Sequence, residues 1–194
     1  LNEKPELLKS CGRPAIDTQV EIRDENDNPL PIGEIGQICA KGPQIMKGYW
    51  NKKEESEKAL KGGWMHTGDA GRMDEEGFVF IQDRIKDMIV SGGENIYSTE
   101  VEAALFAHPD VVDAAVIGVP DEKYGEVVKA CIVKKEGSNV TEADLISFCK
   151  DRIASYKKPQ SVDFIDEVPR NASGKVLKKV LREPYWKDQE RQVS

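Results

Sequence analysis

Thr67-Gly68-Asp69 is the first stretch whose residue types could do chemistry. The carboxylate of Asp69 follows a glycine and lies between two segments that we expect to be strands. On a loop at that place, it could accept two hydrogen bonds from a vicinal diol such as a ribose. An ordinary turn is the simpler explanation of these three residues taken alone. His66, which precedes them, has no partner recognisable in the sequence and is better interpreted as a structural histidine than as a general base.

The stretch from Asp83 to Asn95 combines a cation with a pair of glycines. The guanidinium of Arg84 offers a planar fork of donors that suits phosphate or ribose oxygens. Ser91-Gly92-Gly93 would let the backbone approach a ligand more closely than any Cβ allows, although the same residues also fit a hairpin turn. Because mostly strands are predicted before this stretch and both strands and helices after it, we interpret it as a hinge.

A third candidate stretch runs from Pro169 to Val176 and contains Gly174-Lys175. It is not a Walker phosphate loop, because proline occupies the position where that loop requires its first glycine. A lysine beside a glycine could still stabilise negative charge on a transferring phosphoryl or carboxyl group. The alternative is an ordinary surface lysine.

The elements that must position these residues follow from hydrophobic periodicity and turn signals. Strands are expected at residues 18–23, 36–42, 77–83, 111–119, 127–133 and 161–165, and helices at 51–60, 98–106, 141–153 and 175–183. Ser98 or Thr99 and Thr141 are suitable helix caps. This order predicts an α+β fold, in which a small antiparallel β-rich subdomain is followed by a compact α+β C-terminal domain with a mixed sheet and about three helices.

The net charge of −7 over 194 residues argues against general binding to nucleic acids or membranes. The charge is uneven, because residues 150–187 contain ten Lys/Arg and five Asp/Glu, whereas residues 98–149 contain four and ten. The basic segment could face an anionic ligand or form a solvated surface. No apolar run approaches the roughly 20 residues that cross a bilayer, and the first residues lack the features of a signal peptide, so we expect no transmembrane segment and a cytoplasmic location.

The four cysteines are Cys11, Cys39, Cys131 and Cys149. They lie far apart in the sequence and include no Cys-x-x-Cys pair. We therefore expect reduced, mostly buried thiols and no metal ligands.

Taken in order and with their spacing, these motifs resemble the C-terminal third of an adenylate-forming enzyme of the superfamily that includes acyl-CoA synthetases, luciferases and the adenylation domains of peptide synthetases. The resemblance extends from about Gly12 to Glu183 and rests on four ordered blocks, which are hard to obtain by chance. The blocks are Gly33-Glu34-Ile35-Gly36 with Gly42 and Gly48-Tyr49-Trp50; Gly63 to Asp69; Asp83-Arg84-Ile85-Lys86-Asp87 with Gly92 to Ile96; and Asn171 to Val176.

The resemblance implies a two-step reaction. A carboxylate attacks the α-phosphate of ATP, which is bound with Mg²⁺, to give acyl-AMP and pyrophosphate; a thiol, usually that of CoA, then displaces AMP to give a thioester. It also implies a role for each candidate residue. Asp69 would bind the ribose hydroxyls and Arg84 the nucleotide, Lys175 would be catalytic in adenylation, Lys86 would be the hinge residue, and Ser91, Gly92, Gly93, Tyr124 and Lys157 would contact CoA.

Two blocks of this superfamily are missing from the chain: the Ser/Thr/Gly-rich phosphate loop followed by Pro-Lys-Gly, and the aromatic-Gly-x-Thr-Glu block. The resemblance therefore implies that residues 1–82 are the last β-rich subdomain of a large N-terminal AMP-binding domain, 83–87 the hinge and 88–194 a mobile C-terminal domain. We expect a fragment of an acyl-CoA ligase, closest to the fatty-acyl-CoA ligases. It should be inactive without the N-terminal domain, because that domain positions the reactants.

The other partners implied by the resemblance are ATP or AMP, CoA and a carboxylic acid, with no nucleic acid. A standalone nucleotide-binding, CoA-binding or partner-interaction module without catalysis is the alternative. A peptide-synthetase adenylation domain is disfavoured, because no carrier segment follows Lys187.

Overall fold

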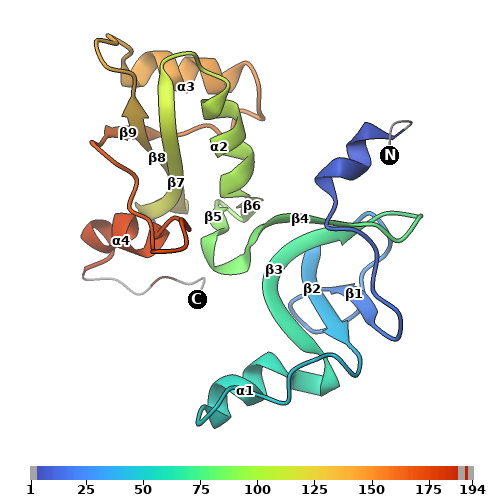
Figure 1. Ribbon diagram of the computed structural model, residues 1–194. Helices are drawn as coiled ribbons and strands as arrows, with labels where there is room; N and C mark the ends of the chain where they lie inside the picture. Colours follow the sequence, from blue (N-terminus) through green and yellow to red (C-terminus); the bar gives the residue numbers. More distant parts are fainter. Residues whose placement is uncertain (1–3, 188–190, 192–194) are drawn as a thin grey trace. The chain divides into compact units, whose positions relative to one another are not determined.

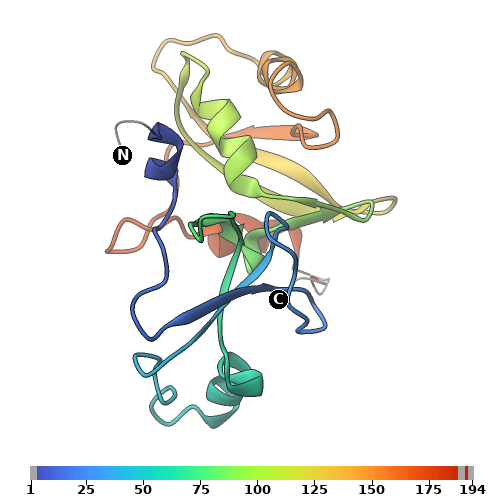
Figure 2. The same cartoon turned by 90° about the vertical axis from the view of Figure 1, so that its right-hand side faces the viewer.

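The computed structural model describes residues 4–187 and 191 of the chain. The chain divides into two compact units, Leu1–Ile85 and Lys86–Ser194. Figures 1 and 2 show that the first unit is built mainly of strands, and that the second combines a sheet with helices. Within the described residues, no helix has the length and apolar character needed to cross a membrane.

A four-stranded antiparallel sheet forms the first unit, with the strand order β1-β2-β3-β4. The strands are β1 (Gln19–Arg23), β2 (Gly36–Lys41), β3 (Met65–Met73) and β4 (Val79–Arg84); 3-10 turn η1 (Pro5–Lys9) precedes them, and helix α1 (Lys53–Ala59) and 3-10 turn η2 (Lys61–Gly63) connect β2 to β3. Ile22 and Ile38 are direct cross-strand partners, and with Val79 they form the buried core of this unit. The alternation of apolar and polar residues along β1 accounts for this one-sided core.

Strand β3 is the largest departure of the first unit from the sequence-based expectation. Thr67-Gly68-Asp69 lies inside this strand and not on a loop between strands. The sequence pattern does not predict this strand, because glycines and several of its polar residues have low β propensity. Gly71 has a packing reason, since a Cβ there would come within 2.5 Å of the Phe80 carbonyl oxygen. The strand curves strongly (Figure 1), as expected from the irregular pairing on both of its sides.

The second unit contains a mixed five-stranded sheet with the order β6-β5-β8-β7, to which β9 adds by pairing with β8 in parallel. The strands are β5 (Ile89–Ser91), β6 (Glu94–Ile96), β7 (Val111–Asp121), β8 (Gly125–Lys134) and β9 (Ser161–Phe164). The helices are α2 (Ser98–Phe106), α3 (Glu142–Lys150) and α4 (Lys178–Arg182), with 3-10 turns η3 (Ile85–Asp87) and η4 (Glu183–Tyr185). The expected α+β fold, with a mixed sheet and three helices after an antiparallel sheet, is confirmed.

Helices pack on both faces of this sheet. Val101 and Leu105 of α2 and Leu145 of α3 join the main core with Val116 and Ile132, and Figures 1 and 2 show α2 lying along the sheet. On the other face, Ile117, Val119 and Cys131 pack with Leu181 of α4 and with Tyr185. Neighbouring residues of β7 and β8 therefore serve opposite cores, which explains why these strands are continuous apolar runs.

The ends of the helices agree only partly with those predicted from the sequence. Thr141 forms the expected capping box with Asp144 at the start of α3. Helix α2, in contrast, has no Ser or Thr cap: its N-cap is Tyr97, whose side chain does not cap the helix, and Ser98 is already helical. Helix α4 begins at Lys178 and not at Lys175, because residues 171–175 close on themselves as a loop.

The cysteines lead to a first testable prediction. Cys39, Cys131 and Cys149 are buried and Cys11 is exposed, and burial raises the pKa of each of the three buried thiols to about 11. One thiol per chain should therefore react quickly with a chromogenic disulfide reagent near neutral pH, and the other three only after unfolding in guanidinium. Cys11→Ser should remove the fast phase. A second fast thiol in the native protein would contradict the burial seen here.

Candidate functional site

Asp69 and Arg84 lie side by side on adjacent strands. They are direct Cα partners in the pairing of β3 with β4, and Arg84 Nε is 3.4 Å from Asp69 Oδ1. Their side chains are 28% and 53% exposed, so both remain accessible to a ligand. A partly solvated ion pair of this kind contributes little to stability. Its carboxylate acceptors and guanidinium donors are instead suited to a ribose and a nearby phosphate.

An irregularity in β3 presents Asp69. The pairing of β2 with β3 passes from Gln37↔Ala70 to Cys39↔His66, so that Ile38 alone faces the three residues 67–69. Gly68 adopts a φ of 77° inside this bulge, a conformation that residues with a Cβ rarely adopt. The bulge formed by Thr67-Gly68-Asp69 therefore directs the Asp69 carboxylate away from the regular strand.

Ser91, Gly92 and Gly93 form the hairpin turn between β5 and β6. Gly92 and Gly93 have φ values of 60° and 87°, as a two-residue turn with both φ angles positive requires. The Gly92 amide donates to the Tyr124 carbonyl at 2.9 Å, and a Cβ on Gly92 would lie 3.1 Å from the Tyr124 ring. The fold thus brings together four of the five residues predicted to contact CoA.

Lys157, the fifth of these residues, is held by Glu100 of α2. Its Nζ lies 2.9 and 2.7 Å from the two carboxylate oxygens. Burial disfavours the charged ammonium, but the hydrogen bonds to Glu100 outweigh this effect and raise the pKa of Lys157. A phosphate ligand would have to compete with Glu100 for this side chain.

The loop that carries Lys175 is closed by one asparagine side chain. Oδ1 of Asn171 accepts hydrogen bonds from the amides of Ser173 and Lys175 at 3.0 and 2.9 Å and from the Ser173 hydroxyl at 2.8 Å. Gly174 supplies the φ of 79° that the tight loop needs. The backbone beside Lys175 is therefore fixed by local bonds rather than by a helix.

The same loop is tethered to the sheet through Arg170. Its guanidinium binds both oxygens of Asp113 on β7, at 3.0 and 2.8 Å, and the Gly174 carbonyl at 3.0 Å. Lys175 itself is exposed, and in the part of the chain that the structure describes its ammonium makes no hydrogen bond or ion pair. Lys175 is therefore an exposed cation on a loop whose backbone is held by Asn171 and Arg170.

Arg182 of α4 binds the backbone beside the predicted hinge residue. It donates to the Lys86 carbonyl at 3.0 Å and forms a 3.0 Å ion pair with Asp87, in which both side chains are 13% exposed. Burial and the charge of nearby Arg191 lower the pKa of Arg182, while Asp87 opposes that shift. Arg182 therefore holds the first residues of the second unit, Lys86 and Asp87, against α4.

Arg191 reinforces this grip. It donates to the carbonyls of Lys86 and Met88 and pairs with the buried carboxylate of Glu126, whose Oε1 lies 2.6 Å from Arg191 Nε. Neither arginine was identified from the sequence, because both lie roughly a hundred positions from the backbone that they bind.

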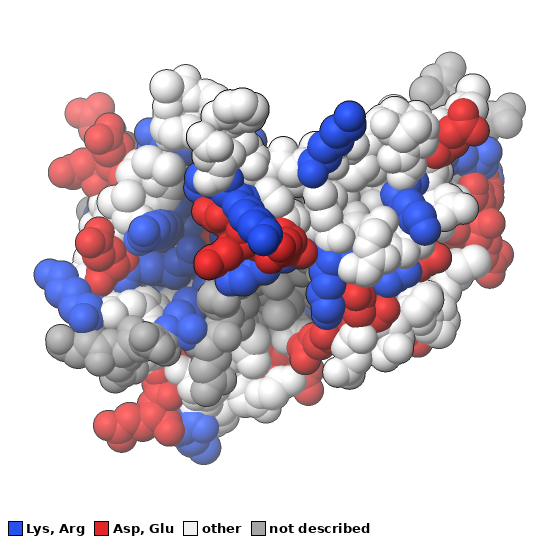
Figure 3. Space-filling model, turned by 90° about the horizontal axis from the view of Figure 1, so that it is seen from below, with Lys and Arg blue, Asp and Glu red and all other residues white. Residues whose placement is uncertain are grey.

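The basic excess of residues 150–187 is partly neutralised within the second unit. Four of its ten cations form ion pairs: Lys157 with Glu100, Arg170 with Asp113, Lys178 with Glu102 and Arg182 with Asp87. Figure 3 accordingly shows blue and red side chains interspersed on the face that it presents. An anionic ligand would therefore be recognised by individual cations such as Lys175 rather than by a uniformly basic surface.

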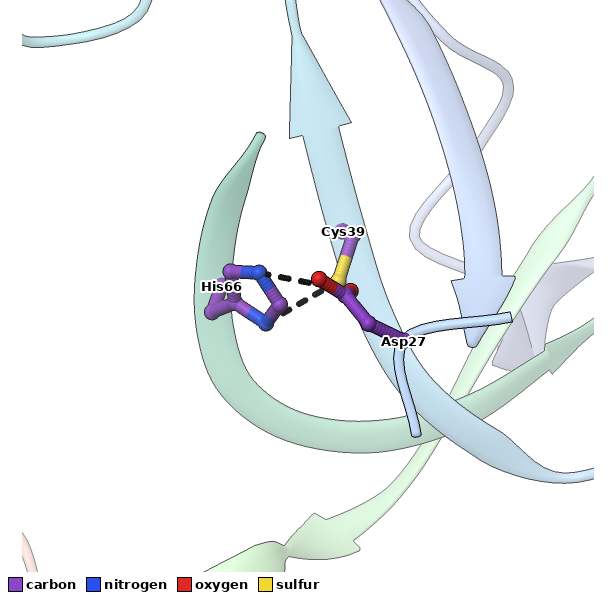
Figure 4. Close-up of side chains that lie close together, drawn as sticks. All are labelled: Asp27, Cys39 and His66. Atoms are coloured by element: carbon purple, nitrogen blue, oxygen red, sulfur yellow. Dashed lines mark hydrogen bonds and ion pairs between the residues drawn. The ribbon is translucent and has the colours of Figure 1, made fainter. Parts of the chain in front are cut away.

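The first unit also gathers three residues with metal-binding chemistry, Asp27, Cys39 and His66, whose ligand atoms lie within 4.8 Å of one another. Figure 4 shows the carboxylate and the thiol on the same side of the imidazole. His66 Nδ1 bonds to Gln37 Oε1 at 2.8 Å, and Nε2 is 3.6 Å from Asp27 Oδ1. Zinc accepts these donor types, and the sequence did not suggest the group because its members are far apart along the chain.

Two observations argue against a metal ion in this group. Arg23 and Lys61 already neutralise Asp27, with their nitrogens 3.3 and 3.8 Å from its carboxylate oxygens. Burial raises the pKa of the Cys39 thiol to about 11, so a metal ion would have to displace its proton. The group fits a packed polar network better than a metal site, and His66 is accordingly a structural residue.

A β-rich unit with an exposed Asp–Arg pair, followed by a mixed-sheet unit with an exposed lysine on a closed loop, defines the C-terminal part of an adenylate-forming enzyme. Family models agree: the AMP-binding enzyme model matches residues 1–50, and the AMP-binding enzyme C-terminal domain model matches residues 100–175. The chain belongs to the AMP-binding enzyme family.

Individual relatives agree with this membership. The chain is 43% identical over 188 residues to fatty acid–[acyl-carrier-protein] ligase ScoC of Streptomyces coeruleorubidus (97% of this chain, 36% of the relative). It is 45% identical over 175 residues to 2-succinylbenzoate–CoA ligase of Geobacillus kaustophilus (90% and 36%). The crystal structure of ATP-bound MatB from Rhodopseudomonas palustris superposes with a TM-score of 0.86 at 40% identity (91% and 36%). The chain thus spans a little over a third of the length of these relatives.

Proposed function

We propose that the protein acts as an ATP-dependent acid–thiol ligase. In the first half-reaction, a carboxylate oxygen of the substrate attacks the α-phosphorus of MgATP, and pyrophosphate leaves. In the second, the thiol sulfur of CoA attacks the acyl carbonyl carbon, AMP leaves with the bonding electron pair, and the thiol proton is released. Atoms and charges balance without an oxidant or a reductant.

The observation that carries this proposal is the Asp69–Arg84 pair, which the strand register places side by side and leaves accessible. Asp69 would accept hydrogen bonds from the ribose hydroxyls, and Arg84 would donate to nucleotide oxygens. Lys175 would stabilise charge that develops during adenylation, because its ammonium is exposed on a braced loop. Lys86 would be the hinge residue between the half-reactions.

The acceptor site is proposed around the β5–β6 turn. Ser91, Gly92 and Gly93 expose backbone that a narrow pantetheine chain could follow, and Tyr124 borders it. Pantetheine is also the thiol arm of acyl-carrier proteins, and one relative is a ligase for such a carrier. We propose CoA as the acceptor; a faster reaction with an acyl-carrier protein would revise that choice.

The acyl substrate is proposed only as a carboxylic acid. Relatives of similar identity are ligases of fatty acids, ferulate and 2-succinylbenzoate, so they support the reaction class rather than the fatty-acyl class that we expected. The residues preceding this chain in the whole enzyme would have to supply the phosphate loop and the acyl pocket, and residues 1–82 would be the last part of their domain.

The test is carboxylate-dependent exchange of labelled pyrophosphate into ATP by the enzyme that contains this chain, across fatty, aryl and dicarboxylic acids. At least one acid should stimulate exchange, and adding CoA should then release AMP and a thioester. The 194-residue chain alone should show no exchange, because the phosphate-loop motif is not among its residues. No exchange by the whole enzyme with any acid would overturn the proposal, whereas exchange by the chain alone would overturn only its predicted inactivity.

A further inference from the structure

We propose that Thr67 is the positioning residue for the Asp69 carboxylate, and that its hydroxyl sets how well the site binds a nucleotide with an intact ribose diol. This inference rests on the proposed function, in which Asp69 binds the ribose. It assigns a role to a residue that would not itself touch the ligand.

The Thr67 side chain connects β3 to β2 at the bulge. Ile38 faces three residues of β3, so the regular one-to-one pairing of the two strands is interrupted at this point. Thr67 Oγ1 donates a hydrogen bond to the Ile38 carbonyl at 2.8 Å. The side chain therefore connects β2 to β3 at the point where the pairing of the two strands is irregular.

The same hydroxyl also fixes the residue that would bind the ligand. The Asp69 amide donates to Thr67 Oγ1 at 3.1 Å, so one oxygen links the Ile38 carbonyl on β2 to the Asp69 backbone. A valine at position 67 keeps the shape of threonine but can neither donate nor accept. Both bonds would be lost together, and the three-residue bulge would have no internal tie.

The flanks of the bulge cannot replace this tie. On the upstream side, His66 is anchored through Nδ1 to Gln37 Oε1 at 2.8 Å, which fixes where the bulge begins but not its course. On the downstream side, Asp69 is paired with Arg84 of β4, which sets the position of its Cα, but the Arg84 side chain that contacts its carboxylate is 53% exposed. An exposed arginine is a ligand contact rather than a rigid support.

The experiment measures the KM for ATP, and for 2′-deoxy-ATP and 2′,3′-dideoxy-ATP, in the pyrophosphate-exchange reaction of the whole enzyme. Thr67→Val should raise the KM for ATP about 5- to 10-fold with little change in kcat, as expected for losing about one hydrogen bond's worth of ground-state binding. With 2′,3′-dideoxy-ATP, which lacks both hydroxyls, the variant and the parent should agree within about twofold, because there is no ribose contact left to weaken.

Three further variants make the result specific. Thr67→Ser keeps the hydroxyl and should restore the parent KM for ATP. Thr18→Val removes a hydroxyl of the same unit that, within the described residues, bonds only to the exposed Gln44 side chain, and should change nothing. If Thr67→Val does not fold, Gly68→Ala tests the same bulge: its Cβ would meet nothing within 4 Å, so only the φ of 77° is disfavoured, and it should show the same diol dependence.

Asp69→Ala separates the failure of this inference from that of the proposed function. Its KM defect should be large with ATP and nearly absent with 2′,3′-dideoxy-ATP. If Asp69→Ala behaves so but Thr67→Val weakens all three nucleotides equally, or none of them, the inference about Thr67 is wrong while the ribose contact stands. If the KM defect of Asp69→Ala does not depend on the ribose hydroxyls, the proposed ribose contact is wrong, and the inference about Thr67 is wrong as well.

Discussion

Lys175→Ala in the whole enzyme should slow acyl-AMP formation by about 100-fold or more, the usual cost of removing one group that stabilises transition-state charge. The ammonium of Lys175 has no partner in the described part of the chain that would compete with a ligand, and Asn171 and Arg170 brace its backbone. Supplying preformed acyl-AMP and CoA bypasses the first half-reaction, so thioester formation should then remain within about threefold of the parent. Pyrophosphate exchange and thioester release measure the two steps separately.

Lys179→Ala is the matched control for this prediction. Lys179 is an exposed lysine on α4, four positions away, and its removal should leave both half-reactions unchanged. Equal loss of both steps in Lys175→Ala would mean that the loop supports the fold and does not serve adenylation. Loss of thioester formation alone would reverse the proposed assignment.

Lys86→Pro should separate the half-reactions in the opposite sense. The carbonyls of Lys86 and Met88 are bound by Arg182 and Arg191, so the first backbone rotation upstream of these bonds is the φ angle of Lys86. Proline fixes φ near −65° and restricts the preceding Ile85. We expect adenylation to stay within about threefold of the parent, while thioester formation from acyl-AMP falls at least about 10-fold, because the second arrangement of the hinge becomes inaccessible.

Lys86→Ala is the control, since the Lys86 side chain is exposed and alanine leaves the backbone free. Both half-reactions should survive this change. If the proline variant loses both steps equally while its far-UV circular dichroism is native, residue 86 is not the pivot. A proline variant that retains both steps would lead to the same conclusion.

The long elements of the fold could be predicted because their signals are local. The β-branched runs at 111–119 and 127–133 became β7 and β8, each slightly longer than expected, and the capping box of Thr141 marked the start of α3. Strands β5 and β6, with three residues each, and β3 with its glycines carry no such pattern. Strands β5 and β6 pair with each other, and β3 pairs with β2 and β4; pairing of this kind is not visible in the pattern of a single strand.

The candidate site divides in the same way. Motif resemblance named Asp69, Arg84 and Lys175, but the contact between Asp69 and Arg84 follows from strand register, which the sequence does not display. Thr67 was visible as part of a motif, yet its hydroxyl acquires a role only when β2 is paired with β3. The arginines that grip residues 86–88 gave no signal at all, because a guanidinium that binds a backbone carbonyl leaves no complementary residue type in the sequence.

The grip on residues 86–88 also has a consequence for the order of events during synthesis. The first unit is complete at Ile85, and N-terminal segments generally fold while the ribosome is still adding the rest of the chain. Arg182 and Arg191 emerge about a hundred residues after the carbonyls that they bind. These bonds to residues 86–88 can therefore form only after the end of the second unit has been synthesised and has packed against the beginning of that unit.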